Sequence, residues 1–233
     1  MSKIFTTLLL TLWLSVGAAW AGDVEDADDA SERKDYATAL TKYKIAALKK
    51  DAYAQAQVGN IYREGLGVVQ DYAEAVRWYK LAAAQGDVGA QLNLGLMYNF
   101  GPGVVQDYAE AVRWYKLAAA QGFAQAQFNL AINYANGQGV VQDYAEAVRW
   151  YKLAAAQGDA GAQINLGAMY HNGKGVAQDY MRAHMWWNLA AVKGNADAVK
   201  NRDIVASRMT AQQIAEAQKL ARECQARNFK NCD

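Results

Sequence analysis

The stretch GVVQDYAEAVRWYKLAAAQG occurs three times without a substitution, at residues 67–86, 103–122 and 139–158. The copies stand 36 residues apart, and the Gln-Asp pair inside them returns at the same spacing at Gln178. A fixed period between about 20 and 50 residues is typical of arrays in which each unit packs on the next. The chain is therefore expected to fold as a repeat array.

The second half of each period predicts an amphipathic helix. In DYAEAVRWYKLAAAQG, residues Tyr72, Val76 and Tyr79 recur at helical spacing on one apolar face. Asp71 followed by Glu74 predicts a capping box at the start, and Gly86 is placed to end the helix.

The first half of each period predicts another helix, AYAQAQVGNIYREG in the first repeat. Its core stripe includes Val58 and Ile61, and the small residue Gly59 would let the second helix approach closely. Gly65 and Gly67 are expected to end it and turn the chain into the second helix. One such helix pair buries too little apolar surface to fold alone, so the pairs are expected to stack.

The segments outside the repeats are expected to cap the array. Residues 35–50 follow the second-helix pattern with polar substitutions, and residues 195–233 hold degenerate helices and a tail. Thr210 and Gln213 predict a capping box for the last helix. Residues 22–34 are acidic, then mixed in charge, and are interpreted as a solvated lead-in.

Residues 1–21 carry the pattern of a secretory leader. A single charge at Lys3 precedes an apolar run, and Ala19-Trp20-Ala21 supplies small residues for cleavage after Ala21. An uncleaved membrane anchor is the alternative, but the apolar run is short for a span. We expect an exported protein, periplasmic or secreted, with no stable membrane insertion after cleavage.

The balance of charge argues against nucleic acid as a partner. The full chain has 24 basic and 23 acidic residues, and loss of Lys3 with the leader leaves 23 of each. Binding to phosphates normally requires a basic excess or a basic face, and the sequence predicts neither.

The two cysteines, Cys224 and Cys232, both lie near the end of the sequence. An exported chain meets oxidising conditions, so the pair is a disulfide candidate, with two free thiols as the alternative. Metal binding is disfavoured because no histidine is near.

The repeat AQxNLGxMYxxGxGVxQDYxxAxxWYxxAAxQG resembles the Sel1-like repeat, a relative of the tetratricopeptide repeat. The resemblance covers residues 51–194 as four units, at 51–86, 87–122, 123–158 and 159–194. It implies an all-α solenoid, a right-handed superhelix of antiparallel helix pairs. It also implies a protein-interaction scaffold, often exported in bacteria, whose first helices line a concave face.

Catalytic patterns are weak. Ser31 to Lys34 is formally S-x-x-K, but the S-D-N and K-T-G partners of penicillin-recognising enzymes are missing. His171 and His184 lack a second ligand at metal-binding spacing, although His171 could face a ligand. The sequence predicts no enzyme, no cofactor and no metal site.

Positions opposite the core stripe of the first helix vary among repeats and predict a partner-binding groove. One row stays an amide in every repeat, and amides can hold the main chain of an extended peptide. The alternative is that the amides bridge adjacent helices and the apolar neighbours pack between repeats. The predicted groove residues are Gln57, Asn60, Asn93, Leu96, Phe100, Asn129, Ile132, Asn165 and His171.

The sequence thus favours an exported scaffold that binds a protein or extended peptide. Two alternatives remain open at this stage. One is binding or hydrolysis of cell-wall fragments or β-lactams, by analogy with a cysteine-rich branch of the same family. The other is a structural protein that spaces envelope components with its outer face.

Overall fold

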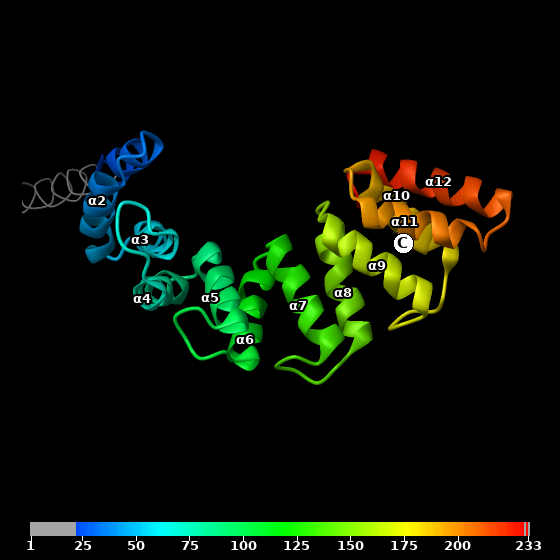
Figure 1. Cartoon of the computed structure of the whole chain (residues 1–233), viewed down its shortest axis with the longest axis horizontal. Coiled ribbons are helices and arrows are strands. Elements are labelled where there is room, and N and C mark those ends of the chain that lie inside the picture. The colour runs from blue at the N-terminus through cyan, green and yellow to red at the C-terminus, as the bar shows by residue number, and fades with distance from the viewer. Residues whose placement is uncertain (1–21, 231, 233) are drawn as a thin grey trace, which may run out of the picture. The chain divides into compact units, whose positions relative to one another are not determined.

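The computed structural model describes residues 22–230 and 232, and the leader predicted at 1–21 lies outside this range. Residues 22–32 are helical, and further helices follow (Figure 1). These are α2 (Tyr36–Leu48), α3 (Ala52–Glu64), α4 (Tyr72–Ala84), α5 (Val88–Phe100), α6 (Tyr108–Ala120), α7 (Ala124–Asn136), α8 (Tyr144–Ala155), α9 (Ala160–Asn172), α10 (Tyr180–Val192), α11 (Ala196–Ala206) and α12 (Ala211–Ala226). The described residues contain no strand, and none of their helices is long and apolar enough to cross a bilayer.

The chain divides into an N-terminal unit, residues 1–106, and a C-terminal unit, residues 107–233. In the N-terminal unit α2 packs on α3, α3 on α4 and α4 on α5. In the C-terminal unit each helix from α6 to α10 packs on the next, and α11 and α12 both pack on α10. Consecutive packing of 36-residue helix pairs confirms the predicted all-α solenoid.

Aspartates begin the second helices. The Asp71 side chain accepts a hydrogen bond from the backbone N–H of Glu74 at 2.9 Å, as an N-cap does. The predicted capping box at this position is wrong, because the Glu74 carboxylate accepts from Arg77 and from Nε1 of Trp78 instead. The box predicted at Thr210 and Gln213 is confirmed at the start of α12.

The second glycine of each Gly-x-Gly turn lies against the preceding second helix. Gly139 has φ +72°, and a Cβ there would lie 2.2 Å from the carbonyl oxygen of Tyr108. In the first helices, a Cβ at Gly59 would lie 2.7 Å from the Tyr79 ring. The small residues therefore let α3 and α4 approach closely, as predicted.

Lysines of the second helices lie over tyrosines of the first helices that follow. The Nζ of Lys80 is 5.6 Å from the centroid of the Tyr98 ring, and the Nζ of Lys116 is 5.6 Å from that of Tyr134. Contacts of this kind contribute about 0.5–1 kcal/mol at exposed sites. The verbatim repeats thus carry an inter-repeat contact as well as a core.

Residues 22–32 correct the interpretation of a solvated lead-in. Ala27 and Ala30 are fully buried in the core of the N-terminal unit. Asp26 pairs with Lys42 at 2.5 Å, and Asp23 pairs with Lys49 at 2.7 Å, so both carboxylates face α2. The acidic side chains are partners for a basic neighbouring helix.

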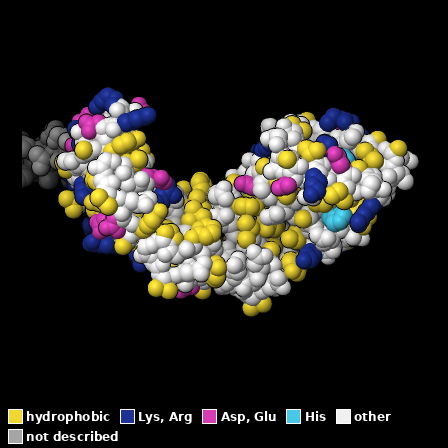
Figure 2. All heavy atoms as spheres, in the orientation of Figure 1, with side chains coloured by type: hydrophobic (Ala, Val, Ile, Leu, Met, Phe, Trp, Pro, Cys, Tyr) yellow, Lys and Arg dark blue, Asp and Glu magenta, His cyan; other side chains and the backbone are white. Residues whose placement is uncertain are grey.

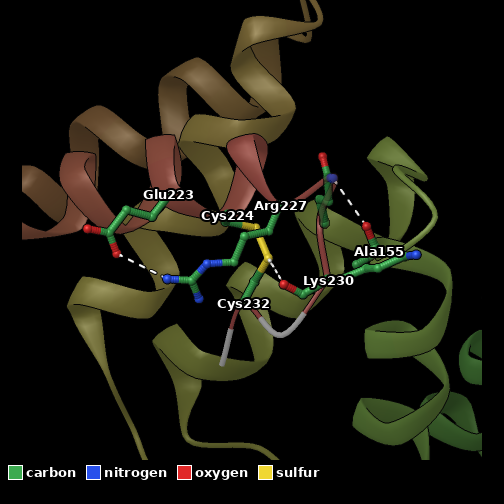
Figure 3. The surroundings of a disulfide bond; sticks show 7 residues. Ala155, Glu223, Cys224, Arg227, Lys230 and Cys232 are labelled. Carbon is green, nitrogen blue, oxygen red and sulfur yellow. Dashed lines mark hydrogen bonds and ion pairs between the residues drawn. A yellow bond between two sulfur atoms is a disulfide. The ribbon is translucent and has the colours of Figure 1, made fainter.

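The end of the chain is tied to α12 by a disulfide between Cys224 and Cys232, whose Cα atoms are 5.0 Å apart (Figure 3). Ala217, Ala221 and Cys224 form the buried side of α12. An ion pair between Glu223 and Arg227, 3.6 Å long, lies beside the disulfide. The tail is therefore part of the C-terminal core.

Candidate functional site

Three predicted groove residues of the N-terminal unit, Gln57, Asn60 and Asn93, form a connected row of half-buried side chains. Nδ2 of Asn60 donates to Oε1 of Gln57 at 3.0 Å on α3. Nδ2 of Asn93, on α5, donates to Oδ1 of Asn60 at 3.4 Å. The hydroxyl of Tyr79 donates to the same Oδ1 at 2.7 Å. Gln57, Asn60 and Asn93, called here the amide row, are thus brought together.

These bonds agree with part of the alternative in which the amides bridge adjacent helices, since the Asn60 side chain links α3 to α5. They differ in strength, however. The bond from Tyr79 is short, whereas both bonds of Asn93 are 3.4 Å long and lie at the outer limit of hydrogen-bond geometry. A ligand main chain could replace such long bonds at little cost.

Arg63 closes the row and was not predicted. Its Nη1 donates to Oδ1 of Asn93 at 3.4 Å, its Nη2 pairs with Glu64 at 2.6 Å, and its Nε is buried without a hydrogen-bond partner. The position is the one that His171 occupies in the fourth repeat. The sequence could have indicated Arg63 through this equivalence, because His171 is one of the predicted groove residues.

Two apolar residues accompany the row on α5. Leu96 is half-buried, and Phe100 is 71% exposed at the end of the helix. A single exposed aromatic side chain is common on protein surfaces, so Phe100 does not identify a binding site by itself.

The C-terminal unit carries the corresponding amides with fewer links. Oδ1 of Asn129 accepts from Gln125 at 3.3 Å, but its Nδ2 is buried without a partner. Nδ2 of Asn165 donates to the hydroxyl of Tyr151 at 3.2 Å, and burial raises the pKa of Tyr151 to about 12, which keeps the phenol neutral. Ile132 packs against the hydrophobic core, as the alternative for the apolar positions proposed.

His171 lies among aromatic side chains of α10. Its ring centroid is 5.4 Å from that of Tyr180 and 5.5 Å from that of Trp187. Nδ1 is buried without a partner, and burial together with nearby Arg208 lowers the pKa of the imidazole. The described surroundings of His171 are therefore those of a packed neutral ring.

A hollow of about 320 Å³ lies at one end of the amide row and was missed by sequence reasoning. It is lined by Asp28, Ser31, Glu32, Tyr43, Tyr53 and Gln57. The hydroxyls of Tyr43 and Tyr53 both donate to Oδ1 of Asp28, the latter at 3.0 Å. Burial, then the hydrogen bond to Asp28, raises the pKa of both phenols. Nothing in the sequence indicated this hollow, because Asp28, Ser31 and Glu32 belong to the segment that was interpreted as a solvated lead-in.

A different hollow, of about 480 Å³, is lined by the repeated stretch of the C-terminal unit and includes Arg113, Lys116 and Leu117. Its two cations are already engaged. Arg113 pairs with Glu110 at 3.2 Å, and Lys116 lies over Tyr134. Each cation of this hollow therefore already has a partner within the C-terminal unit.

On the face drawn in Figure 2, basic and acidic side chains are interspersed, with hydrophobic ones exposed among them. Within residues 22–230 and 232, no three His, Cys, Asp or Glu side chains are grouped to hold a metal ion. The observed sites therefore offer amide, aromatic and carboxylate groups.

The arrangement of helix pairs and Gly-x-Gly turns agrees with one family model. Residues 52–87, 88–123, 124–159 and 160–195 each match the Sel1 repeat, one residue later than the units assigned from the sequence. The chain belongs to the Sel1 repeat family. Sel1 repeat proteins are helical scaffolds, generally of protein–protein interaction rather than catalysis. The Sel1 repeats here place the amide row on the first helices.

Solved structures resemble the chain to different degrees. A Sel1 repeat protein from Oxalobacter formigenes is 36% identical, with a TM-score of 0.71 over 75% of this chain and 72% of that protein. A protective antigen of uropathogenic Escherichia coli strains with an SLR fold is 27% identical, with a TM-score of 0.59. The match covers 91% of this chain but 54% of the antigen.

A third structure, of a Sel1 repeat protein from Klebsiella pneumoniae, is 21% identical with a TM-score of 0.51, and shares the fold alone. Among proteins of curated function, none matches this chain.

Proposed function

We propose that this chain is an exported Sel1 repeat scaffold that binds a protein partner as an extended segment along its first helices. The observation that carries the proposal is the amide row of the N-terminal unit. Asn93 is half-buried, and both of its hydrogen bonds are 3.4 Å long. Donors and acceptors held this loosely suit exchange with a peptide main chain.

The contrast between the two helices of each repeat supports this placement. The second helices are identical in three repeats, whereas the first helices differ at the positions of Asn60 and Phe100 while they keep an amide at Gln57, Asn93 and Asn129. Identical surfaces build a regular support, and variable ones can distinguish successive residues of a ligand. In the C-terminal unit, Nδ2 of Asn129 is a buried donor without a partner, so Asn129 also has unused hydrogen-bonding capacity.

Export is part of the proposal. The leader pattern at residues 1–21 supports it, and a disulfide between Cys224 and Cys232 is stable in an oxidising compartment. The bacterial periplasm is the first choice, and secretion is the second.

A capture experiment tests the proposal. The protein, purified from cells that express the full chain, is immobilised and exposed to an envelope extract of the same organism. Asn93→Ala and Asn129→Ala are combined in one variant, and Gln218→Ala, an exposed amide on α12, serves as the matched control. We expect the wild type and the control to retain a protein that the folded double variant loses.

Two results would overturn this proposal. In one, the double variant keeps its circular dichroism spectrum and captures the same protein as the wild type. In the other, the wild type retains nothing that a bare matrix does not retain.

A further inference from the structure

The hollow beside Gln57 combines a carboxylate with aromatic walls. Oδ1 of Asp28 accepts hydrogen bonds from the hydroxyls of Tyr43 and Tyr53. The two rings meet edge to face with centroids 6.4 Å apart, and Tyr53 is 44% exposed. One oxygen of the carboxylate is thus held by two phenols, and a ring face lies beside it.

The charge of this hollow is unbalanced. Asp28 and Glu32 line it, and none of the residues that line it is basic. Asp23 and Asp26 on the same helix have lysine partners at 2.7 and 2.5 Å. Among the described residues, Asp28 has no basic partner within salt-bridge distance, and Glu32 has none either. A half-buried carboxylate beside an aromatic face is complementary to an organic cation.

The hollow is continuous with the amide row, because Gln57 lines it and bonds to Asn60. We propose that the hollow binds a basic side chain of the partner segment, arginine in preference to lysine, while the amide row holds the main chain beside it. The inference rests on the proposed function and gives it a sequence requirement in the partner.

Arginine is favoured by shape. A guanidinium is planar, so it can stack on the Tyr53 ring while its N–H groups donate to the free oxygen of Asp28. Lysine offers a compact, strongly hydrated charge that stacks less well. A volume of about 320 Å³ is at the lower end of ligand pockets and suits one side chain rather than a larger ligand.

The test uses a single arginine as probe. N-acetyl-arginine N-methylamide is titrated into the isotope-labelled protein, and the NMR signals of Tyr53 and Gln57 are followed. N-acetyl-citrulline N-methylamide has nearly the same shape without the charge, and N-acetyl-lysine N-methylamide tests the preference. Calcium chloride is titrated separately as a competing cation.

Asp28→Asn removes the charge and keeps the shape, and Asp29→Asn is the matched control, since Asp29 is the next residue and does not line the hollow. We expect saturable shifts with arginine, a response at least tenfold weaker with citrulline, and a similar loss in Asp28→Asn but not in Asp29→Asn. If Asp28→Asn unfolds the helix at residues 22–32, Glu32→Gln is used instead, because it replaces an exposed side chain. This variant should weaken arginine binding about threefold.

Equal responses to arginine and citrulline would overturn the inference. So would arginine shifts that persist unchanged in folded Asp28→Asn, or in Glu32→Gln where Asp28→Asn does not fold. Shifts with calcium but not with arginine would assign the hollow to a metal ion and overturn it too. If the protein captures its partner through Asn93 but does not bind arginine, only this inference is wrong. If it binds arginine but captures no partner, the proposed function is wrong.

Discussion

The Gln157 side chain donates a hydrogen bond to Oε1 of Gln127 at 2.8 Å, and Gln127 donates in turn to the carbonyl oxygen of Ala119 at 3.2 Å. Gln85 and Gln55 form the same bond at 2.8 Å in the N-terminal unit. The buried residues Gln127 and Gln55 each connect a first helix to the end of its own second helix and to the end of the preceding helix. They satisfy carbonyl groups that a helix end leaves without intrahelical partners.

This link is missing in the fourth repeat. Its absence predicts that equivalent substitutions in the third and fourth repeats lower the stability of the protein by different amounts. Lys193 stands where Gln157 stands in the third repeat, and it donates to the carbonyl oxygen of Gly158 instead. Oε1 of Gln163 is left buried without a partner. We expect Gln127→Leu to lower the free energy of unfolding by about 2 kcal/mol and Gln163→Leu by less than about 1 kcal/mol. Urea titrations followed by tryptophan fluorescence measure both, and equal losses would contradict the link.

Glycines of positive φ predict a second pair of variants. Gly139→Ala places a Cβ 2.2 Å from the carbonyl oxygen of Tyr108, whereas Gly122→Ala, at φ +87°, meets nothing within 4 Å. The left-handed backbone alone costs about 1 kcal/mol for alanine. We expect Gly122→Ala to cost that amount and Gly139→Ala at least about 3 kcal/mol, because the backbone must also move. Comparable thermal melting temperatures for the two variants would refute the close approach.

The fold was predictable because the 36-residue period repeats every packing constraint several times. Gly59 and the Gly-x-Gly turns could be interpreted from residue size and backbone freedom alone. The helix at residues 22–32 could not, since its charges are matched by Lys42 and Lys49 on another helix. Charge composition predicts which segments are solvated, but it does not show whether a charged residue has a partner on a different helix.

Acid should destabilise the C-terminal unit through His184. This imidazole is 2% exposed, its Nδ1 has no hydrogen-bond partner, and burial followed by nearby Arg202 lowers its pKa below 6.5. The unfolded chain then binds a proton that the folded chain rejects, so stability is full above about pH 6.5 and falls as pH decreases below it. Asp203 opposes the shift.

Melting temperatures at pH 7.5 and pH 5 check this, with His184→Leu compared with wild type. The wild type should lose more stability on acidification than the variant does. The same loss in both proteins would assign the acid effect to other groups, His171 among them.

Reduction of the disulfide should affect the C-terminal unit. The bridge joins residues 8 apart in sequence, and closing so short a loop in the unfolded chain stabilises by about 2–3 kcal/mol on entropic estimates. We expect reductant, or the pair Cys224→Ala and Cys232→Ala, to lower the unfolding midpoint of this unit. Hydrogen exchange in α12 should rise while exchange in α3 stays unchanged. Unchanged exchange in α12 after reduction would show that packing alone holds the tail.

The candidate site was predictable in part. Gln57 and Asn93 were predicted because their row keeps an amide in every repeat, and Asn60 was predicted because its position varies among repeats. The structure brings the three together. Their mutual bonds could not be foreseen, since they depend on how α3 and α5 approach. The hollow around Asp28 escaped for the same reason, because it depends on residues distant in sequence, whereas Arg63 was missed although its position matches that of His171.

The most direct test of partner binding places a photo-crosslinking p-benzoylphenylalanine at Phe100, which is 71% exposed beside the amide row, and in a second protein at Val69, which is 88% exposed in the turn before α4. Both proteins are irradiated in the same envelope extract. The account predicts a crosslinked partner from position 100 and none from position 69. A partner crosslinked from position 69 alone, or equally from both, would contradict binding along the first helices.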